Sequence, residues 1–220
     1  MKKVLVTGVS GFIGQHCAAE LLKNGYAVKG SVRSFSRTEE VTKGIKTIID
    51  PKGNFEFVEL NLLKDEGWEE AMQGCEFVLH VASPYVMTEP KDENELIKPA
   101  VEGTLRTLKA AKKAGVKRIV VTSSMVSMLG GVNGSISINQ DSWSNVNAKH
   151  ASAYLKSKTL AEKSAWDFIN GQEGESKLEL VVVNPGPVYG PTLSGNLSGE
   201  SMSMFKNIIS GKMPLLPKAA

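Results

Sequence analysis

Three glycines near the amino terminus constrain the fold more than any other feature of the sequence. Gly8, Gly11 and Gly14 follow a short apolar run at 4–6 and open a stretch at 12–24 whose apolar residues have helical spacing. Glycine permits a tight turn and a close approach to the backbone, and a helix N-terminus offers unpaired N–H groups that attract anions. This order predicts the first βαβ unit of a parallel sheet, with a binding site for a pyrophosphate.

Strand-like and helix-like segments alternate along the rest of the chain. We expect further strands at 27–32, 55–60, 77–81, 118–122 and 178–183, and further helices at 38–49, 68–72, 93–114, 151–169 and 201–209. This alternation indicates a doubly wound α/β protein, a Rossmann fold with a parallel sheet between two helical layers. Right-handed crossovers predict the strand order 3-2-1-4-5-6, with ligands at the carboxyl ends of the strands. Residues 125–150 are rich in Gly, Ser and Asn, and we expect a long functional loop there.

Composition excludes several classes of protein. The 220 residues are 41% hydrophobic and 22% charged, and the formal charge of +3 gives no indication of nucleic-acid binding. Cys17 and Cys75 are far apart and are expected to be free thiols, and the histidines have no metal-ligand spacing. Because no apolar run is long enough for a signal peptide or a membrane helix, we expect a cytoplasmic protein, as a monomer or homodimer, with no membrane partner.

The end of the second expected strand predicts the choice of cofactor. Sites that prefer NAD usually carry an acidic residue here, which binds the ribose hydroxyls. This chain has Arg33 and Arg37 instead, and no carboxylate lies between 31 and 37. Because an arginine pairs with a 2′-phosphate through charge-assisted hydrogen bonds, the sequence predicts NADP(H).

A second group of residues has the chemistry needed to reduce a carbonyl. Tyr154 and Lys158 are four positions apart and therefore share one face of a helix. A nearby ammonium favours the phenolate, so we expect the pKa of Tyr154 to fall from near 10 and make it a usable acid or base. The fifth expected strand ends in Ser123 and Ser124, where a hydroxyl could bind the reacting oxygen. We expect Ser124 to face the ligand, with Ser123 as the second choice.

Taken together, these motifs resemble the extended short-chain dehydrogenases/reductases of the NAD-dependent epimerase/dehydratase superfamily. The resemblance is to the dihydroflavonol-4-reductase-like, cinnamoyl-CoA-reductase-like and aldehyde-reductase-like branch, and it covers nearly all of the chain. It rests on six segments that occur in order, at 6–14, 80–84, 99–104, 121–124, 152–162 and 184–191.

The resemblance implies an oxidoreductase that transfers a hydride from NADPH to the carbonyl of an aldehyde or ketone. Tyr154 would protonate the carbonyl oxygen, Lys158 would lower the pKa of that tyrosine and hold the nicotinamide ribose, and Ser124 would orient the carbonyl. With the motifs above, it gives a cofactor site of Gly8, Ser10, Gly11, Phe12, Ile13, Gly14, Arg33, Arg37, Asn61, Leu62, Val81, Ala82, Ser83, Thr122, Tyr154, Lys158, Pro185, Gly186, Pro187 and Val188.

The chain departs from the family pattern at two positions and in length. Asn61 replaces the usual aspartate beside the adenine, although its amide oxygen still accepts a hydrogen bond. Leu129 replaces the asparagine of plant flavonoid reductases, which disfavours a flavonoid substrate. Because the family's chains are roughly half as long again, we expect a dinucleotide-binding domain at 1–190 and only the start of a substrate lobe at 191–220. The 125–150 loop and residues 85–87 would complete the substrate pocket.

Two other functions remain open at this stage. The first is a nucleotide-sugar epimerase or dehydratase with bound NAD, which Arg33 without a nearby acid disfavours. The second is a non-catalytic NADP-binding sensor or scaffold protein, because a fold alone does not establish chemistry. The complete set of Ser124, Tyr154 and Lys158 disfavours this reading and favours a small-molecule carbonyl or alcohol substrate.

Overall fold

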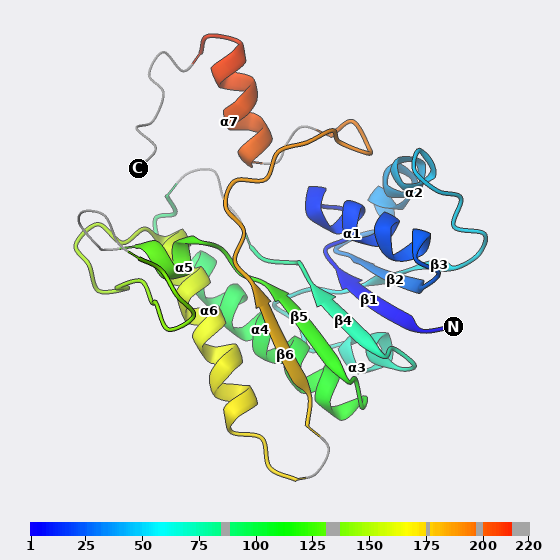
Figure 1. Ribbon diagram of the computed structural model, residues 1–220, viewed down its shortest axis with the longest axis horizontal. Helices are drawn as coiled ribbons and strands as arrows, with labels where there is room; N and C mark the ends of the chain where they lie inside the picture. The colour runs from blue at the N-terminus through cyan, green and yellow to red at the C-terminus, as the bar shows by residue number, and fades with distance from the viewer. Residues whose placement is uncertain (85–88, 131–136, 175–176, 197–199, 213–220) are drawn as a thin grey trace.

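The computed structural model describes residues 1–84, 89–130, 137–174, 177–196 and 200–212. A six-stranded sheet lies at its centre in the order β3-β2-β1-β4-β5-β6, and the pairs that it forms are parallel (Figure 1). The strands are β1 Lys3–Thr7, β2 Ala27–Val32, β3 Phe55–Glu59, β4 Phe77–His80, β5 Arg118–Thr122 and β6 Glu179–Val183. The predicted fold class and strand order are therefore confirmed.

Two hydrophobic cores, one on each face of the sheet, hold the helical layers in place. Val4 and Val6 of β1 pack into a core with α1 (Phe12–Lys23) and α2 (Thr38–Lys46), whereas Leu5 packs into a second core on the opposite face. Successive side chains of a strand point to opposite faces, so this single strand anchors both layers. The second layer contains α3 Trp68–Met72, α4 Asn94–Lys113 and α6 Ala153–Asn170.

The remaining helices are short or lie late in the chain: the 3-10 helix η1 Phe35–Arg37, α5 Val126–Leu129 and α7 Glu200–Ile209. The helices predicted from sequence all form, with ends displaced by up to three residues. The expectation of an unbroken loop at 125–150 is wrong, because α5 forms there directly after β5. In the described ranges, no helix combines the length and the apolar character that a membrane span requires.

After β6 the chain returns across the first helical layer (Figure 1). The His16 Nε2 atom donates to the carbonyl oxygen of Pro191 over 3.0 Å, and the Gln15 side chain donates to the Ser194 hydroxyl over 3.3 Å. Asn196 donates to the Glu40 carboxylate of α2 over 3.4 Å. These hydrogen bonds join residues 191–196, which we call the return segment, to α1 and α2.

Candidate functional site

A cavity of about 740 Å³ runs along the carboxyl ends of the strands. It is lined by Ser124, Tyr154 and Lys158 and by every residue of the predicted cofactor site except Pro187, which is exposed. Several other lining residues were not predicted from the sequence, among them Ser31, Glu95, Leu96, Pro99 and Met202. The substrate-pocket prediction for residues 85–87 falls outside the described residues.

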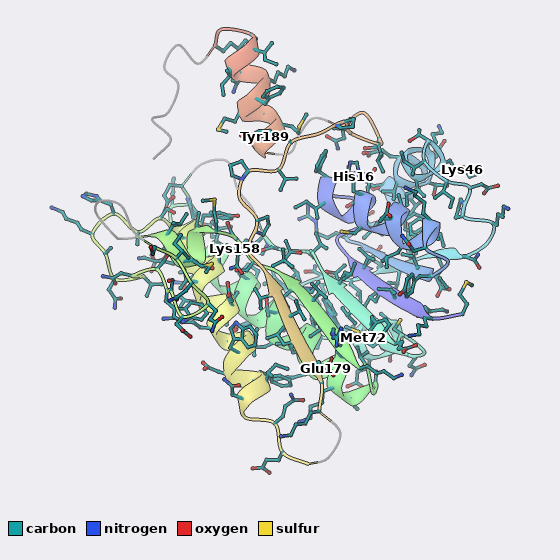
Figure 2. The ribbon with its side chains drawn as sticks, viewed as in Figure 1. His16, Lys46, Met72, Lys158, Glu179 and Tyr189 are labelled. Carbon is teal, nitrogen blue, oxygen red and sulfur yellow. The ribbon has the colours of Figure 1, made fainter. Side chains whose placement is uncertain are left out.

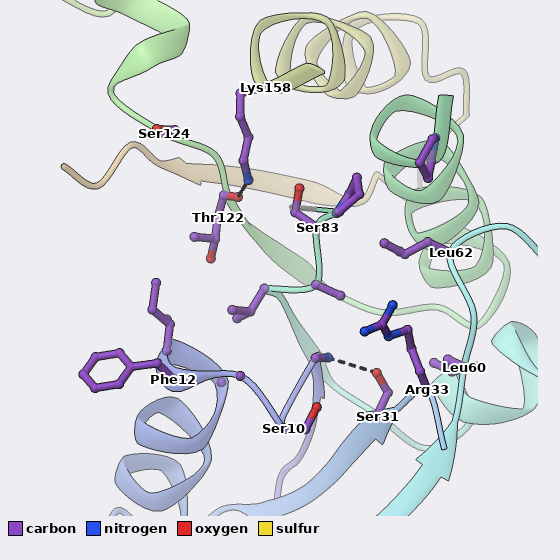
Figure 3. Close-up of a pocket in the computed structure, with 18 of the residues that line it drawn as sticks. Ser10, Phe12, Ser31, Arg33, Leu60, Leu62, Ser83, Thr122, Ser124 and Lys158 are labelled. Carbon is purple, nitrogen blue, oxygen red and sulfur yellow. Dashed lines mark hydrogen bonds between the residues drawn. The ribbon is translucent and has the colours of Figure 1, made fainter. Parts of the chain in front are cut away.

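The glycine loop forms one wall of this cavity (Figure 3). Gly8 has a φ of 68°, in the left-handed region that favours glycine, and its N–H donates to the Ser31 hydroxyl over 3.1 Å. A Cβ atom on Gly14 would lie 2.4 Å from the Gly8 carbonyl oxygen, so only glycine fits there. Gly11 is the N-cap of α1, which has neither a side-chain cap nor an acidic residue in its first turn. The first-turn N–H groups are therefore suited to a diphosphate.

The two arginines at the end of β2 both line the cavity, but they differ in their partners. Arg37 forms a forked ion pair with Glu40, with N···O distances of 3.0 and 2.8 Å. Arg33 is exposed and points into the cavity in Figure 3, and among the described residues it forms no ion pair. Arg33 is therefore the arginine that is available to an incoming phosphate. The i,i+3 spacing of Arg37 and Glu40 was a readable signal of their pairing.

A buried histidine fixes the backbone that follows β4. The Thr7 hydroxyl accepts hydrogen bonds from the N–H groups of Val81 and Ala82, both over 3.0 Å, so its own proton goes to the His80 Nδ1 atom at 3.0 Å. Burial, together with the nearby charge of Lys158, lowers the pKa of His80 to about 3. His80 is thus neutral, with its proton on Nε2, and it holds Val81 and Ala82 in the cavity wall.

Tyr154 lies in the first turn of α6, where two side chains cap the helix. Ser152 accepts a hydrogen bond from the Leu155 N–H over 3.1 Å, and the Glu89 carboxylate accepts one from the Ala153 N–H over 2.6 Å. Both contacts satisfy N–H groups that would otherwise lack a helical partner. They fix the turn that presents Tyr154 to the cavity.

The expected fall in the pKa of Tyr154 is wrong for this structure. Burial raises the pKa of its phenol, and its hydrogen bond with Ser124 lowers that pKa only in part. The Lys158 Nζ atom lies 6.0 Å from the centre of the tyrosine ring, and this amine is itself buried. The phenol is therefore protonated at neutral pH, which is the form that a proton donor needs.

Lys158 extends from α6 to the end of β5 (Figures 2 and 3). Its side-chain amine donates to the Thr122 carbonyl oxygen over 3.4 Å, and the residue is only 8% exposed. Burial lowers the pKa of this amine to about 8, although the charge of Glu162 opposes that effect. Lys158 is therefore mostly charged at pH 7 but close to the pH at which it loses its proton.

The two adjacent serines at the end of β5 have different partners. Ser124 forms a hydrogen bond with the catalytic candidate Tyr154. The Ser123 hydroxyl instead donates to the buried Glu162 carboxylate over 2.5 Å. The geometry therefore favours Ser124 as the serine for the reacting oxygen. Glu162 was not identified by sequence reasoning, although it falls four residues after Lys158 on the same helix.

Comparison with known proteins identifies the family. A family model described as the NAD dependent epimerase/dehydratase family matches residues 4–218. The chain belongs to this family. Its epimerase/dehydratase-family fold is also that of the yeast methylglyoxal/isovaleraldehyde reductase Gre2, solved as a complex with NADPH. That structure superposes with a TM-score of 0.81 at 30% identity, over 99% of this chain and 67% of the reductase.

Two relatives in sequence belong to the branch expected from the motifs. One is a dihydroflavonol 4-reductase from Hordeum vulgare, 36% identical over 88% of this chain and 55% of its own length. The other is aldehyde reductase 2 from Sporidiobolus salmonicolor, 34% identical over 97% of this chain and 67% of its own length. The family resemblance is thus confirmed, and this chain spans between about half and two thirds of the length of these relatives.

Proposed function

We propose that this protein is an NADPH-dependent reductase of aldehydes or ketones, with Tyr154 as the proton donor. The observation that carries the proposal is one cavity that joins an uncapped glycine loop and helix N-terminus to Ser124, Tyr154 and Lys158. Relatives named as reductases, and a similar structure titled as an NADPH complex, support the same activity.

The residues present fit a dinucleotide phosphate. The first-turn N–H groups of α1 would hold the diphosphate, and Arg33, which has no ion pair with any described residue, would hold the 2′-phosphate. We further propose that residues 1–190 form the cofactor-binding part and that residues from 191 onward begin a substrate lobe. Met202 of α7, which lines the same cavity as Tyr154, supports this division.

The chemistry proposed for the chain's own residues follows from their positions. The reduced nicotinamide, when bound, supplies a hydride to the carbonyl carbon. Tyr154 donates its proton to the carbonyl oxygen, and Ser124, already hydrogen-bonded to the phenol, orients that oxygen. The charged Lys158 stabilises the phenolate that remains and holds the nicotinamide ribose.

The proton-donor role is tested by Tyr154→Phe, which removes one hydroxyl and very little volume. A screen of NADPH oxidation over aldehydes, α-dicarbonyls and ketones first supplies a substrate. On that substrate we expect kcat to fall by roughly 10²–10⁴, the usual effect of losing a positioned acid. The Kd for NADPH, measured by fluorescence titration, should stay unchanged because the phenol acts on the substrate oxygen.

Lys158→Met is the matched comparison. It should lower kcat and also weaken NADPH binding, because it removes a charge and a contact to the cofactor. Near-full turnover in both variants would contradict the catalytic assignment and favour a binding module on a reductase fold. Tightly bound NAD in the purified protein would instead favour an epimerase or dehydratase.

A further inference from the structure

A buried carboxylate lies beside the catalytic candidates and has no part in the mechanism above. Glu162 of α6 is 6% exposed. Three donors lie within hydrogen-bond distance of its Oε2 atom. The hydroxyls of Ser123 and Ser127 lie 2.5 and 2.7 Å from it, and the Asn184 amide nitrogen lies 2.8 Å from it. A buried carboxylate is costly unless it is hydrogen-bonded in this way or acts on a nearby charge.

The donors come from three different segments, and two of them follow strands whose ends lie at the cavity. Ser123 directly follows β5, Ser127 lies in α5, and Asn184 directly follows β6. Asn184 also donates to the Ser124 carbonyl oxygen over 3.3 Å, and the Ser127 N–H donates to the same oxygen over 3.0 Å. Glu162 therefore ties together the segments on both sides of Ser124, the residue proposed to orient the carbonyl.

Glu162 also acts on the charge of Lys158, one helical turn earlier on α6. Burial disfavours the charged form of this amine, and the negative charge of Glu162 opposes that effect. Pairs spaced i,i+4 on a helix lie on the same face, and attraction between opposite charges is stronger in a buried site than in water.

Among the residues that the structure describes, the other groups near Lys158 do not supply this negative charge. His80 of β4 is neutral, Tyr154 is protonated, and α5 contains no titratable residue. Glu95 of α4 lines the same cavity but is exposed, so water screens its charge. Several charged side chains of α6, α4 and β5 are paired with other groups: Lys156 with Glu93, Lys98 with Glu102, Arg106 with Asp65, Lys113 with Glu69 and Arg118 with Glu179. Lys109 and Lys112 of α4 are cations and supply no negative charge.

We propose that Glu162 is a positioning residue with two linked roles. Its buried charge keeps the Lys158 amine protonated in the cavity, and its hydrogen bonds fix the strand end that carries Ser124. This inference rests on the proposed function, because it assigns to Lys158 a role toward the cofactor. It extends that function by identifying Glu162 as the group that keeps Lys158 protonated, and therefore able to bind the cofactor, up to a higher pH.

The protonation of Lys158 can be measured without cofactor or substrate. Acetic anhydride reacts only with neutral amines, so the labelling rate of the Lys158 peptide, followed by mass spectrometry, reports the neutral fraction against pH. The wild-type midpoint should lie near pH 8. In Glu162→Gln, which keeps size and an acceptor oxygen, we expect the midpoint to fall by about one pH unit. NADPH binding at pH 8 should then weaken about fivefold, following the loss of protonated amine.

Two further variants separate charge from structure. Ser127→Ala removes one hydrogen bond to the same carboxylate but keeps the charge, so its midpoint should match the wild type. Glu162→Met provides a second neutral side chain in case Glu162→Gln does not fold. An unchanged midpoint in either folded neutral variant would overturn the proposal. So would failure of both to fold while Ser127→Ala folds, because Glu162 would then be purely structural.

Lys158→Met tests the proposed function independently of the inference about Glu162. If Lys158→Met keeps full turnover and NADPH affinity, the proposed function fails whatever the midpoint does. If Lys158→Met is impaired as expected and the Glu162 variants keep the wild-type midpoint, only the inference about Glu162 fails.

Discussion

At the scale of single residues, the two arginines beside the cavity make a testable contrast. Arg33→Asp should weaken NADPH binding by about 1–3 kcal/mol, the range for a hydrogen bond to a charged group. NADH binding should stay constant or improve, because it has no 2′-phosphate. Both affinities can be measured by fluorescence titration at fixed ionic strength.

Arg37→Ala provides the comparison for this prediction. Since Arg37 is already held by the Glu40 carboxylate, its removal should cost less NADPH affinity than the change at Arg33. An equal loss of NADPH and NADH binding in Arg33→Asp would argue against a 2′-phosphate contact at this position.

Most residues of the candidate site could be predicted from the sequence, but the contacts between their side chains could not. The choice of Ser124 over Ser123 depends on which side chain leaves the end of β5 toward Tyr154, and one residue of register reverses it. The direction of the pKa shift of Tyr154 was predicted wrongly, because a sequence shows the neighbouring lysine but not the burial of both groups. Glu162 stood within a recognised motif, yet its three donors come from separate segments that only the fold brings together.

At the scale of elements, two glycines of the same loop have different roles. We expect Gly11 to be needed for cofactor binding and Gly14 to be needed for folding. A Cβ on Gly11 would contact only the Gly8 carbonyl oxygen, at 3.3 Å, whereas one on Gly14 would meet that oxygen at 2.4 Å and the Val9 Cα at 2.9 Å. Gly11→Val should therefore fold but lose NADPH binding, because its side chain occupies the space beside the helix N-terminus. Gly14→Ala should instead lower the free energy of unfolding by about 1–3 kcal/mol.

Urea denaturation and NADPH titration of both variants check this contrast. Wild-type NADPH affinity in folded Gly11→Val would show that this glycine serves the turn alone. Wild-type stability in Gly14→Ala would show that the loop can relax around an added methyl group.

The regular elements were predictable because each carries its own periodic pattern. The six strands and the long helices follow apolar runs or helical spacing bounded by glycine or polar residues, and the strand order follows from right-handed crossovers. The four residues of α5 span about one turn, which is too short to show a period. That turn forms where the tertiary structure places the Ser127 side chain against Glu162 and the Ser124 carbonyl oxygen.

At the scale of the whole molecule, His80 links folding stability to pH. Its pKa is about 3 in the folded protein and near 6.5 in the unfolded chain, so between these values the unfolded state binds the extra proton. This contribution to stability is complete above pH 6.5 and declines as the pH falls. At pH 5.5 the loss of this contribution should lower the free energy of unfolding by about 1 kcal/mol relative to pH 7.

His80→Asn tests this linkage because Asn places an acceptor oxygen where the Nδ1 atom accepts from Thr7. The variant is expected to be less stable at pH 7 but to lose the part of the pH dependence between 5.5 and 7 that His80 supplies. Urea titrations at several pH values measure both quantities. A variant whose stability follows the same slope as the wild type would show that another group is responsible.

The return segment also affects the order in which contacts form during synthesis of the chain. Its hydrogen bonds to Gln15, His16 and Glu40 span 179, 175 and 156 positions of sequence. A ribosome delivers the first βαβ unit long before it delivers residue 196, and contacts between distant segments close only after both have emerged. The parts of α1 and α2 that contact the return segment therefore stay in water until residues 191–196 have emerged, although both helices are made much earlier.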